Sequence, residues 1–127
     1  MSECKLETMF EKRIEFIKEM KETIPGSYPE LPLDMSKKAS QQVCRDLALK
    51  GVEEMFEALQ HLKNWKPHRQ TDLSEVHVNK DEFLEEIVDA FNYFFAMLIV
   101  TGFDEKDLFE AFLSKHEIIN DRLRNGY

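Results

Sequence analysis

The sequence predicts an all-α fold, a bundle of about four main helices, and three observations support this. The chain of 127 residues contains only four glycines and four prolines, which favours helices over a turn-rich β fold. Apolar residues recur every three or four positions over residues 5–22, the pattern of an amphipathic helix. Three prolines and one glycine fall within residues 23–36, which predicts a loop after this helix.

A second, longer helix is expected from about Ser36 to Asn64. Its predicted apolar stripe consists of Ala48, Val52, Met55, Leu59 and Leu62. At about 100° per residue, Glu53, Glu54 and Glu57 fall on the side opposite to this stripe.

A loop over residues 65–79 separates the second helix from the third. The third helix is expected to begin at Asn79, because Asn79 followed by Glu82 resembles a helix-start capping pair. It is expected to end at Gly102, since glycine often follows the last turn of a helix.

The last predicted helix begins after Asp104, where Asp104 and Asp107 are spaced as a cap. We expect this helix to bury Leu108, Phe112 and Ile119. The whole chain, residues 1–127, has the size of one ordinary domain.

Composition and charge limit the class of protein. The formal net charge of −8 argues against nucleic acid as the main partner, because phosphate backbones are bound by clustered Lys and Arg. It leaves a nucleotide possible, since a metal can mediate contact with phosphates. Cys4 and Cys44 have no metal-ligand spacing and are expected to be free thiols in a reducing compartment.

The sequence also favours the cytoplasm and no membrane association. The N-terminal residues lack the uninterrupted apolar core of a signal peptide. The apolar run over residues 87–100 is shorter than the roughly 20 residues of a membrane span.

Two short clusters of carboxylates, at residues 53–57 and 85–89, are the candidate site. Helical residues three apart share a face, so Glu54 pairs with Glu57 and Glu86 pairs with Asp89. Two such pairs facing each other suit Mg²⁺, a hard cation that takes oxygen ligands and keeps positions for water or substrate phosphates. Without a cation, four gathered carboxylates repel one another.

The alternative is that these acidic residues only face solvent, and for the first cluster alone this interpretation stays open. The second cluster is harder to explain that way. Every residue from Ile87 to Val100 is apolar or aromatic except Asp89 and Asn92. Asp89 is therefore expected on a helix with little surface left for water, where a carboxylate is costly unless it is paired or binds a metal.

Lys63, Lys66 and Arg69 form a local basic group next to Trp65. In an acidic protein this group is a candidate for binding the outer phosphates of a substrate. A solvated loop with a half-buried Trp is the alternative. The four histidines are not spaced as a metal site, and each is expected at the surface or in a hydrogen bond.

The two clusters together read Glu-Glu-x-x-Glu at 53–57 and Glu-x-x-Asp at 86–89. This pattern resembles that of the all-α nucleoside triphosphate pyrophosphohydrolases, which include MazG-like proteins, dCTP pyrophosphatases and dimeric dUTPases. The resemblance covers roughly residues 37–127 and is greatest for the dimeric dUTPases. It extends to Asn64-Trp65-Lys66, to residues 85–94 and to the ending with Lys115, Arg122, Gly126 and Tyr127. Asn92 and Ile119 depart from that branch, which often has His and Asn there.

The resemblance implies a role for each of these residues. Glu54, Glu57, Glu86 and Asp89 would bind Mg²⁺, and Glu53 and Glu54 would act on the attacking water. The residues expected to bind substrate are Trp65, Lys66, Asn92, Lys115, Arg122 and Tyr127.

The expected reaction is the hydrolysis of a deoxynucleoside triphosphate, dUTP first, to the monophosphate and pyrophosphate. The alternatives are a broader MazG-like or dCTP pyrophosphatase, and a helical interaction module without catalysis. A homodimer is expected because the aromatic-rich third helix carries more apolar surface than so short a chain covers alone. That surface includes Phe91, Phe94, Phe95 and Met97.

Overall fold

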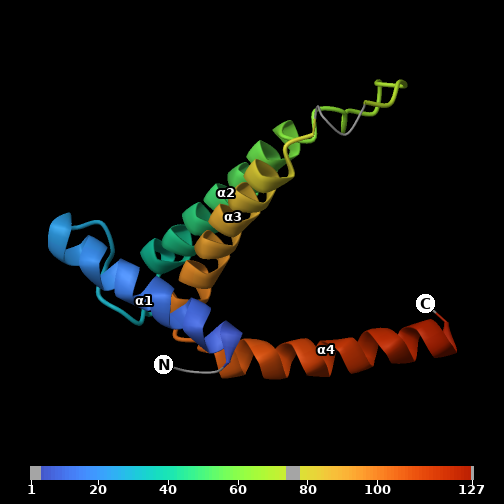
Figure 1. Ribbon diagram of the computed structural model, residues 1–127. Coiled ribbons are helices and arrows are strands. Elements are labelled where there is room, and N and C mark those ends of the chain that lie inside the picture. The colour runs from blue at the N-terminus through green and yellow to red at the C-terminus, as the bar shows by residue number, and fades with distance from the viewer. Residues whose placement is uncertain (1–3, 74–77, 127) are drawn as a thin grey trace. The chain divides into compact units, whose positions relative to one another are not determined.

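The computed structural model describes residues 4–73 and 78–126, and within these ranges the chain forms four α-helices and no strand. The helices are α1 (Lys5–Thr23), α2 (Lys38–Gln60), α3 (Lys80–Val100) and α4 (Glu105–Asn125), as Figure 1 shows. The predicted all-α class is therefore confirmed.

The helices belong to two compact units. One unit holds α1, the loop as far as Pro32, and the chain from Leu98 onward, which includes α4. The other unit, Leu33–Met97, holds α2 and most of α3. These units describe how the helices pack, so the single domain expected for residues 1–127 stays a prediction.

Helices α2 and α3 lie side by side and run in opposite directions (Figure 1). Gly51 and Ala58 of α2 and Ala90 of α3 are buried. A Cβ atom built on Gly51 would lie only 2.5 Å from Cε1 of Phe94. Glycine at this position therefore leaves room for the Phe94 ring of α3, which would have to shift to accommodate a larger residue.

Of the apolar stripe predicted for the second helix, Val52 is 45% exposed, while Ala48, Met55, Leu59 and Leu62 are half-buried. The buried residues of α2 are Ser40, Leu47, Gly51 and Ala58. Glu54 follows Gly51 by three residues and precedes Ala58 by four, so it lies on the same side of the helix as these buried residues. The placement of Glu54 opposite the buried side is therefore wrong, because the prediction took no account of Gly51 and Ala58.

The junction between α2 and α3 is fixed by hydrogen bonds. Lys63 has a left-handed backbone conformation (φ 71°), which explains why α2 ends before the predicted Asn64. Oδ1 of Asn79 accepts a hydrogen bond from the backbone N–H of Glu82 at 3.1 Å, which confirms the predicted cap. The backbone N–H of Asn79 donates to the carbonyl of His61 at 3.1 Å, tying the two helices together.

In the other unit, α4 begins at the predicted cap. The backbone N–H of Asp107 donates to Oδ1 of Asp104 at 2.9 Å, and that of Asp104 donates to Oδ2 of Asp107 at 3.0 Å. The two contacts complete a capping box.

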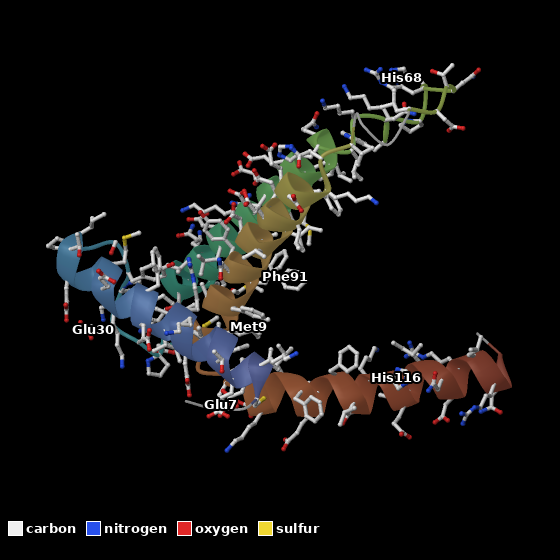
Figure 2. All side chains as sticks on the ribbon, in the orientation of Figure 1. Glu7, Met9, Glu30, His68, Phe91 and His116 are labelled. Atoms are coloured by element: carbon white, nitrogen blue, oxygen red, sulfur yellow. The ribbon has the colours of Figure 1, made fainter. Side chains whose placement is uncertain are left out.

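The predicted burial along α4 is wrong. Leu108 is half-buried, but Phe112 and Ile119 are 65% and 42% exposed, and α4 buries no residue. Figure 2 shows side chains, including His116, projecting around the helix. The first residues of α4, as far as Glu110, line a hollow together with the start of α1.

None of the described helices combines the length and the apolarity that crossing a bilayer requires.

We predict that Gly51→Ala destabilises the protein by about 1–3 kcal/mol, although alanine is the better helix former by about 1 kcal/mol. The physical reason is the overlap of the new Cβ with the Phe94 ring. Urea unfolding monitored by circular dichroism measures the change. Lys50→Ala, at an exposed neighbouring position, is the control, and Phe94→Leu is expected to relieve part of the loss. Equal stability of Gly51→Ala and Lys50→Ala would contradict the close contact.

Candidate metal centre

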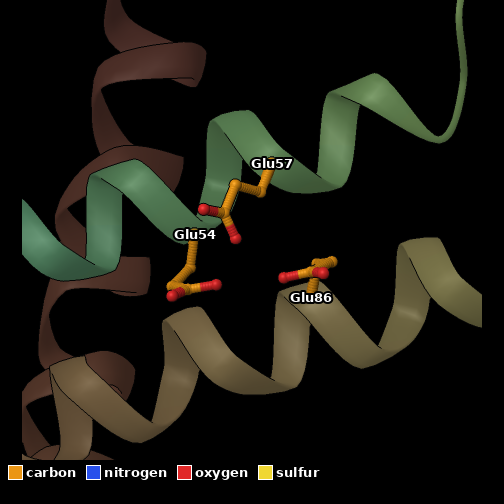
Figure 3. Close-up of side chains that lie close together, drawn as sticks. All are labelled: Glu54, Glu57 and Glu86. Atoms are coloured by element: carbon orange, nitrogen blue, oxygen red, sulfur yellow. The ribbon is translucent and has the colours of Figure 1, made fainter.

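Three carboxylates meet across the contact between α2 and α3. Glu54 and Glu57 come from α2 and Glu86 comes from α3, and Figure 3 shows their carboxylates turned toward one another. One oxygen of each lies within 4.8 Å of an oxygen of both others. The structure thus brings together three of the four predicted metal ligands.

Helical spacing explains this gathering. Glu54 lies between the buried Gly51 and Ala58 of α2, and Glu86 precedes the buried Ala90 of α3 by four residues. Side chains at such spacings share a face of their helix. The carboxylates of Glu54 and Glu86 therefore lie on the same sides of their helices as buried residues.

The clustering of the carboxylates changes the pKa of one of them, Glu54. The pKa of Glu54 is raised from 4.5 to about 7. The largest cause is the loss of water around this half-buried carboxyl, followed by hydrogen bonds with Glu57 and Glu86 and by the negative charges of Glu57 and Asp89. Near neutral pH Glu54 is therefore still partly protonated, and a bound cation would replace that proton.

The donor set fits a hard divalent cation. Mg²⁺ binds oxygens at about 2.0–2.1 Å in an octahedron, so its ligand oxygens lie roughly 3 Å apart when adjacent and roughly 4 Å apart when opposite. Small side-chain rotations bring oxygens that are within 4.8 Å of one another into this range. Three carboxylates leave positions of the octahedron for water or for substrate oxygens.

His61 extends the cluster toward the junction of the helices. Its Nδ1 lies 3.0 Å from Oε2 of Glu82, and its Nε2 lies 3.7 Å from Oε1 of Glu86. His61 was expected at the surface or in a hydrogen bond, and its contacts with Glu82 and Glu86 were not anticipated. A signal was present, because His61 follows Glu54 by seven residues, or two helical turns, on the same side of the chain.

Asp89 and Glu53 lie outside this group of three carboxylates. Asp89 is exposed, so the expectation that it has little access to water is wrong. The reason is that α3 leaves a face uncovered, with Val88 50% and Phe91 47% exposed. The charge of Asp89 nevertheless acts on Glu54. Glu53 is exposed and lines an open hollow of about 580 Å³ together with Phe56 and Glu57.

The residues predicted to bind substrate are less completely placed. Trp65 is half-buried, and its ring centroid lies 6.0 Å from that of Phe56, the neighbour of Glu57. Lys66 is exposed, and Asn92 is half-buried on α3. Lys115 and Arg122 are exposed residues of α4, which belongs to the other unit. Tyr127 lies outside the described residues. The roles of these six residues stay predictions.

Comparison with known proteins gives no match to a protein-family model, to a curated protein or to a solved structure. The chemistry of this chain is therefore inferred from its own residues and from the motif resemblance.

The stability of the metal-free protein is predicted to fall as pH rises through about 7. The pKa of Glu54 in the folded chain, about 7, is above its ordinary value of 4.5. The folded state therefore favours the protonated carboxyl, and this stabilisation is complete below about pH 4.5 and is lost above pH 7. Allowing for the partial exposure of the group, we expect a loss of roughly 1 kcal/mol.

Urea unfolding in the presence of a chelator, repeated from about pH 5 to about pH 8, measures this loss. Glu54→Gln removes the titrating group and should flatten that part of the profile. Asp81→Asn, an exposed acid elsewhere on α3, should leave it unchanged. An identical pH profile for Glu54→Gln and the unaltered protein would contradict the assignment.

Proposed function

We propose that this protein is a Mg²⁺-dependent nucleoside triphosphate pyrophosphohydrolase that converts a deoxynucleoside triphosphate, dUTP first, to the monophosphate and pyrophosphate. The observation that supports it most directly is the convergence of Glu54, Glu57 and Glu86 from two helices. The spacing of the acidic motif, which resembles that of the all-α pyrophosphohydrolases, indicates the same chemistry.

A cation is needed because of charge. Three carboxylates and a triphosphate would repel each other, and the chain as a whole carries a net charge of −8. Glu54, Glu57 and Glu86 would hold Mg²⁺, with Asp89 beside them. When bound, Mg²⁺ neutralises phosphate oxygens and acidifies a coordinated water.

The chain's own residues would position the reactants. Glu53 and the half-buried Glu54 are the candidates for orienting the attacking water and accepting its proton as the bond to the leaving pyrophosphate breaks. Lys66, Lys115 and Arg122 are candidates for phosphate contacts. Trp65, Asn92 and Tyr127 are candidates for contacts with the nucleoside.

The exposed apolar surface supports a homodimer as part of this proposal. On α3, Leu84 and Val88 are 61% and 50% exposed, and on α4, Phe112 and Leu123 are 65% and 72% exposed. Apolar side chains repeated along one helix are typical of a surface that another chain covers. A cytoplasmic location accords with a nucleotide substrate.

Two other functions stay under consideration. A broader MazG-like or dCTP pyrophosphatase would use the same carboxylates with a different base preference. A helical interaction module is favoured by the uncovered apolar residues of α4, and it would require no metal.

Pyrophosphate release in the presence of Mg²⁺ from dUTP, dCTP, dTTP, dATP, dGTP and UTP tests the proposal. Glu86→Gln is expected to lower the rate by about 100-fold or more, because it removes a ligand charge where the cation contributes several kcal/mol. Asp89→Ala is expected to lower it as well. Glu85→Gln is the matched control, since Glu85 is the exposed preceding residue with the same charge.

The substrate pattern separates the candidates. Release from dUTP alone supports a dUTPase, and release from several nucleotides supports a broader pyrophosphatase. No release from any nucleotide, or full activity of Glu86→Gln with its helix content intact, would refute the hydrolase and favour the interaction module.

A further inference from the structure

The imidazole of His61 lies between two carboxylates of the same helix. Glu82 and Glu86 are one turn apart on α3 and share a face. Nδ1 of His61 lies 3.0 Å from Oε2 of Glu82, and Nε2 lies 3.7 Å from Oε1 of Glu86. His61 itself follows the last residue of α2, Gln60. One side chain from the end of α2 thus contacts a candidate metal ligand on α3.

The His61 ring is linked to its own backbone through two hydrogen bonds and one short imidazole–carboxylate contact. The carbonyl of His61 accepts from the backbone N–H of Asn79 at 3.1 Å. Oδ1 of Asn79 accepts from the backbone N–H of Glu82 at 3.1 Å. Oε2 of Glu82 in turn lies 3.0 Å from Nδ1 of His61. Because each member restrains the next, the imidazole has a defined orientation at the helix junction.

The side of the ring that faces the cluster is partly shielded from water. The side chains of His61 and Glu86 are 26% and 25% exposed, whereas that of Glu82 is 55% exposed. The contact with Glu82, at 3.0 Å, has the length of a hydrogen bond. The contact of 3.7 Å with Glu86 is longer than a hydrogen bond, so the ring acts there as a neighbour that limits the rotation of the carboxylate.

Imidazole and carboxylate partners of this kind tune metal sites. A group that holds a ligand in place changes metal affinity without binding the metal, typically by 10–100-fold when it is removed. Of the three clustered carboxylates, Glu86 is the one that α3 contributes. The orientation of the Glu86 carboxylate therefore decides whether oxygens from α2 and α3 can bind the same cation.

We propose that His61, anchored by Glu82, is a positioning residue that holds the Glu86 carboxylate against Glu54 and Glu57 and so sets the affinity of the cluster for a divalent cation. The inference rests on the proposed function, because it concerns the same cluster. It adds residues that neither acidic motif contains. In this arrangement Glu82 acts only through His61.

Titration with Mn²⁺ alone, followed by isothermal calorimetry on the full chain, tests this inference. His61→Ala is expected to weaken Mn²⁺ binding by about 10–100-fold, and Glu82→Gln by a smaller factor. The double variant should bind Mn²⁺ no more weakly than His61→Ala does, because Glu82 acts on Glu86 only through His61. His61→Gln, which keeps a long polar side chain, should recover part of the affinity.

Two variants serve as matched controls. His116→Ala removes an exposed histidine of α4, and Asp81→Asn removes an exposed acid in the first turn of α3. Neither should alter Mn²⁺ binding. Circular dichroism of each variant at the titration temperature separates loss of the ligand geometry from loss of the fold, since a merely structural role would lower thermal stability without changing affinity.

The outcomes distinguish this inference from the function on which it rests. If the unaltered protein binds Mn²⁺ and a folded His61→Ala binds it equally or more tightly, the positioning role is overturned and the metal site stands. If the unaltered protein binds Mn²⁺ no better than Glu86→Gln, both are overturned. Should His61→Ala fail to fold, Mn²⁺ affinities of Glu82→Gln and His61→Gln equal to that of the unaltered protein would overturn the positioning role.

Discussion

The close packing of α2 against α3 is the constraint on which the rest of this structure depends. Gly51 of α2 leaves room for the Phe94 ring of α3, which a larger side chain would displace. In that contact the chain places Glu54 and Glu86, where packing alone would favour apolar residues. The raised pKa of Glu54 is the direct consequence, because a carboxyl group that is removed from water and placed beside other carboxylates favours its protonated form.

Such an arrangement lowers stability unless a positive charge offsets it. Replacing buried charged groups by apolar ones of similar volume often stabilises a protein, so carboxylates in a helix contact are most readily understood as part of a binding site. The contacts that join His61, Asn79 and Glu82 support this view. Polar groups of the helix junction place the His61 imidazole beside the Glu86 carboxylate.

The sequence predicts much of this architecture because the signals are local. Periodicity gives the four helices, and the caps at Asn79 and Asp104 depend on residues only three positions apart. The pairing of Glu54 with Glu57 follows from helical geometry in the same way.

What the sequence does not predict depends on contacts between helices. The buried row of α2 passes through Gly51 and Ala58, which a search for large apolar residues overlooks. The exposure of Asp89 and of Phe112 depends on how helices pack, which periodicity within one helix does not give. The contact of His61 with Glu86 joins residues separated by a loop, so spacing within one helix cannot reveal it.

Anomalous diffraction from crystals of the protein grown with Mn²⁺ and a non-hydrolysable nucleoside triphosphate tests the metal site most directly. We expect anomalous density between α2 and α3, with metal-to-oxygen distances of about 2.1 Å to Glu54, Glu57 and Glu86. A crystal in which nucleotide is bound while these carboxylates hold no metal, or in which Mn²⁺ is bound only elsewhere on the chain, would contradict it.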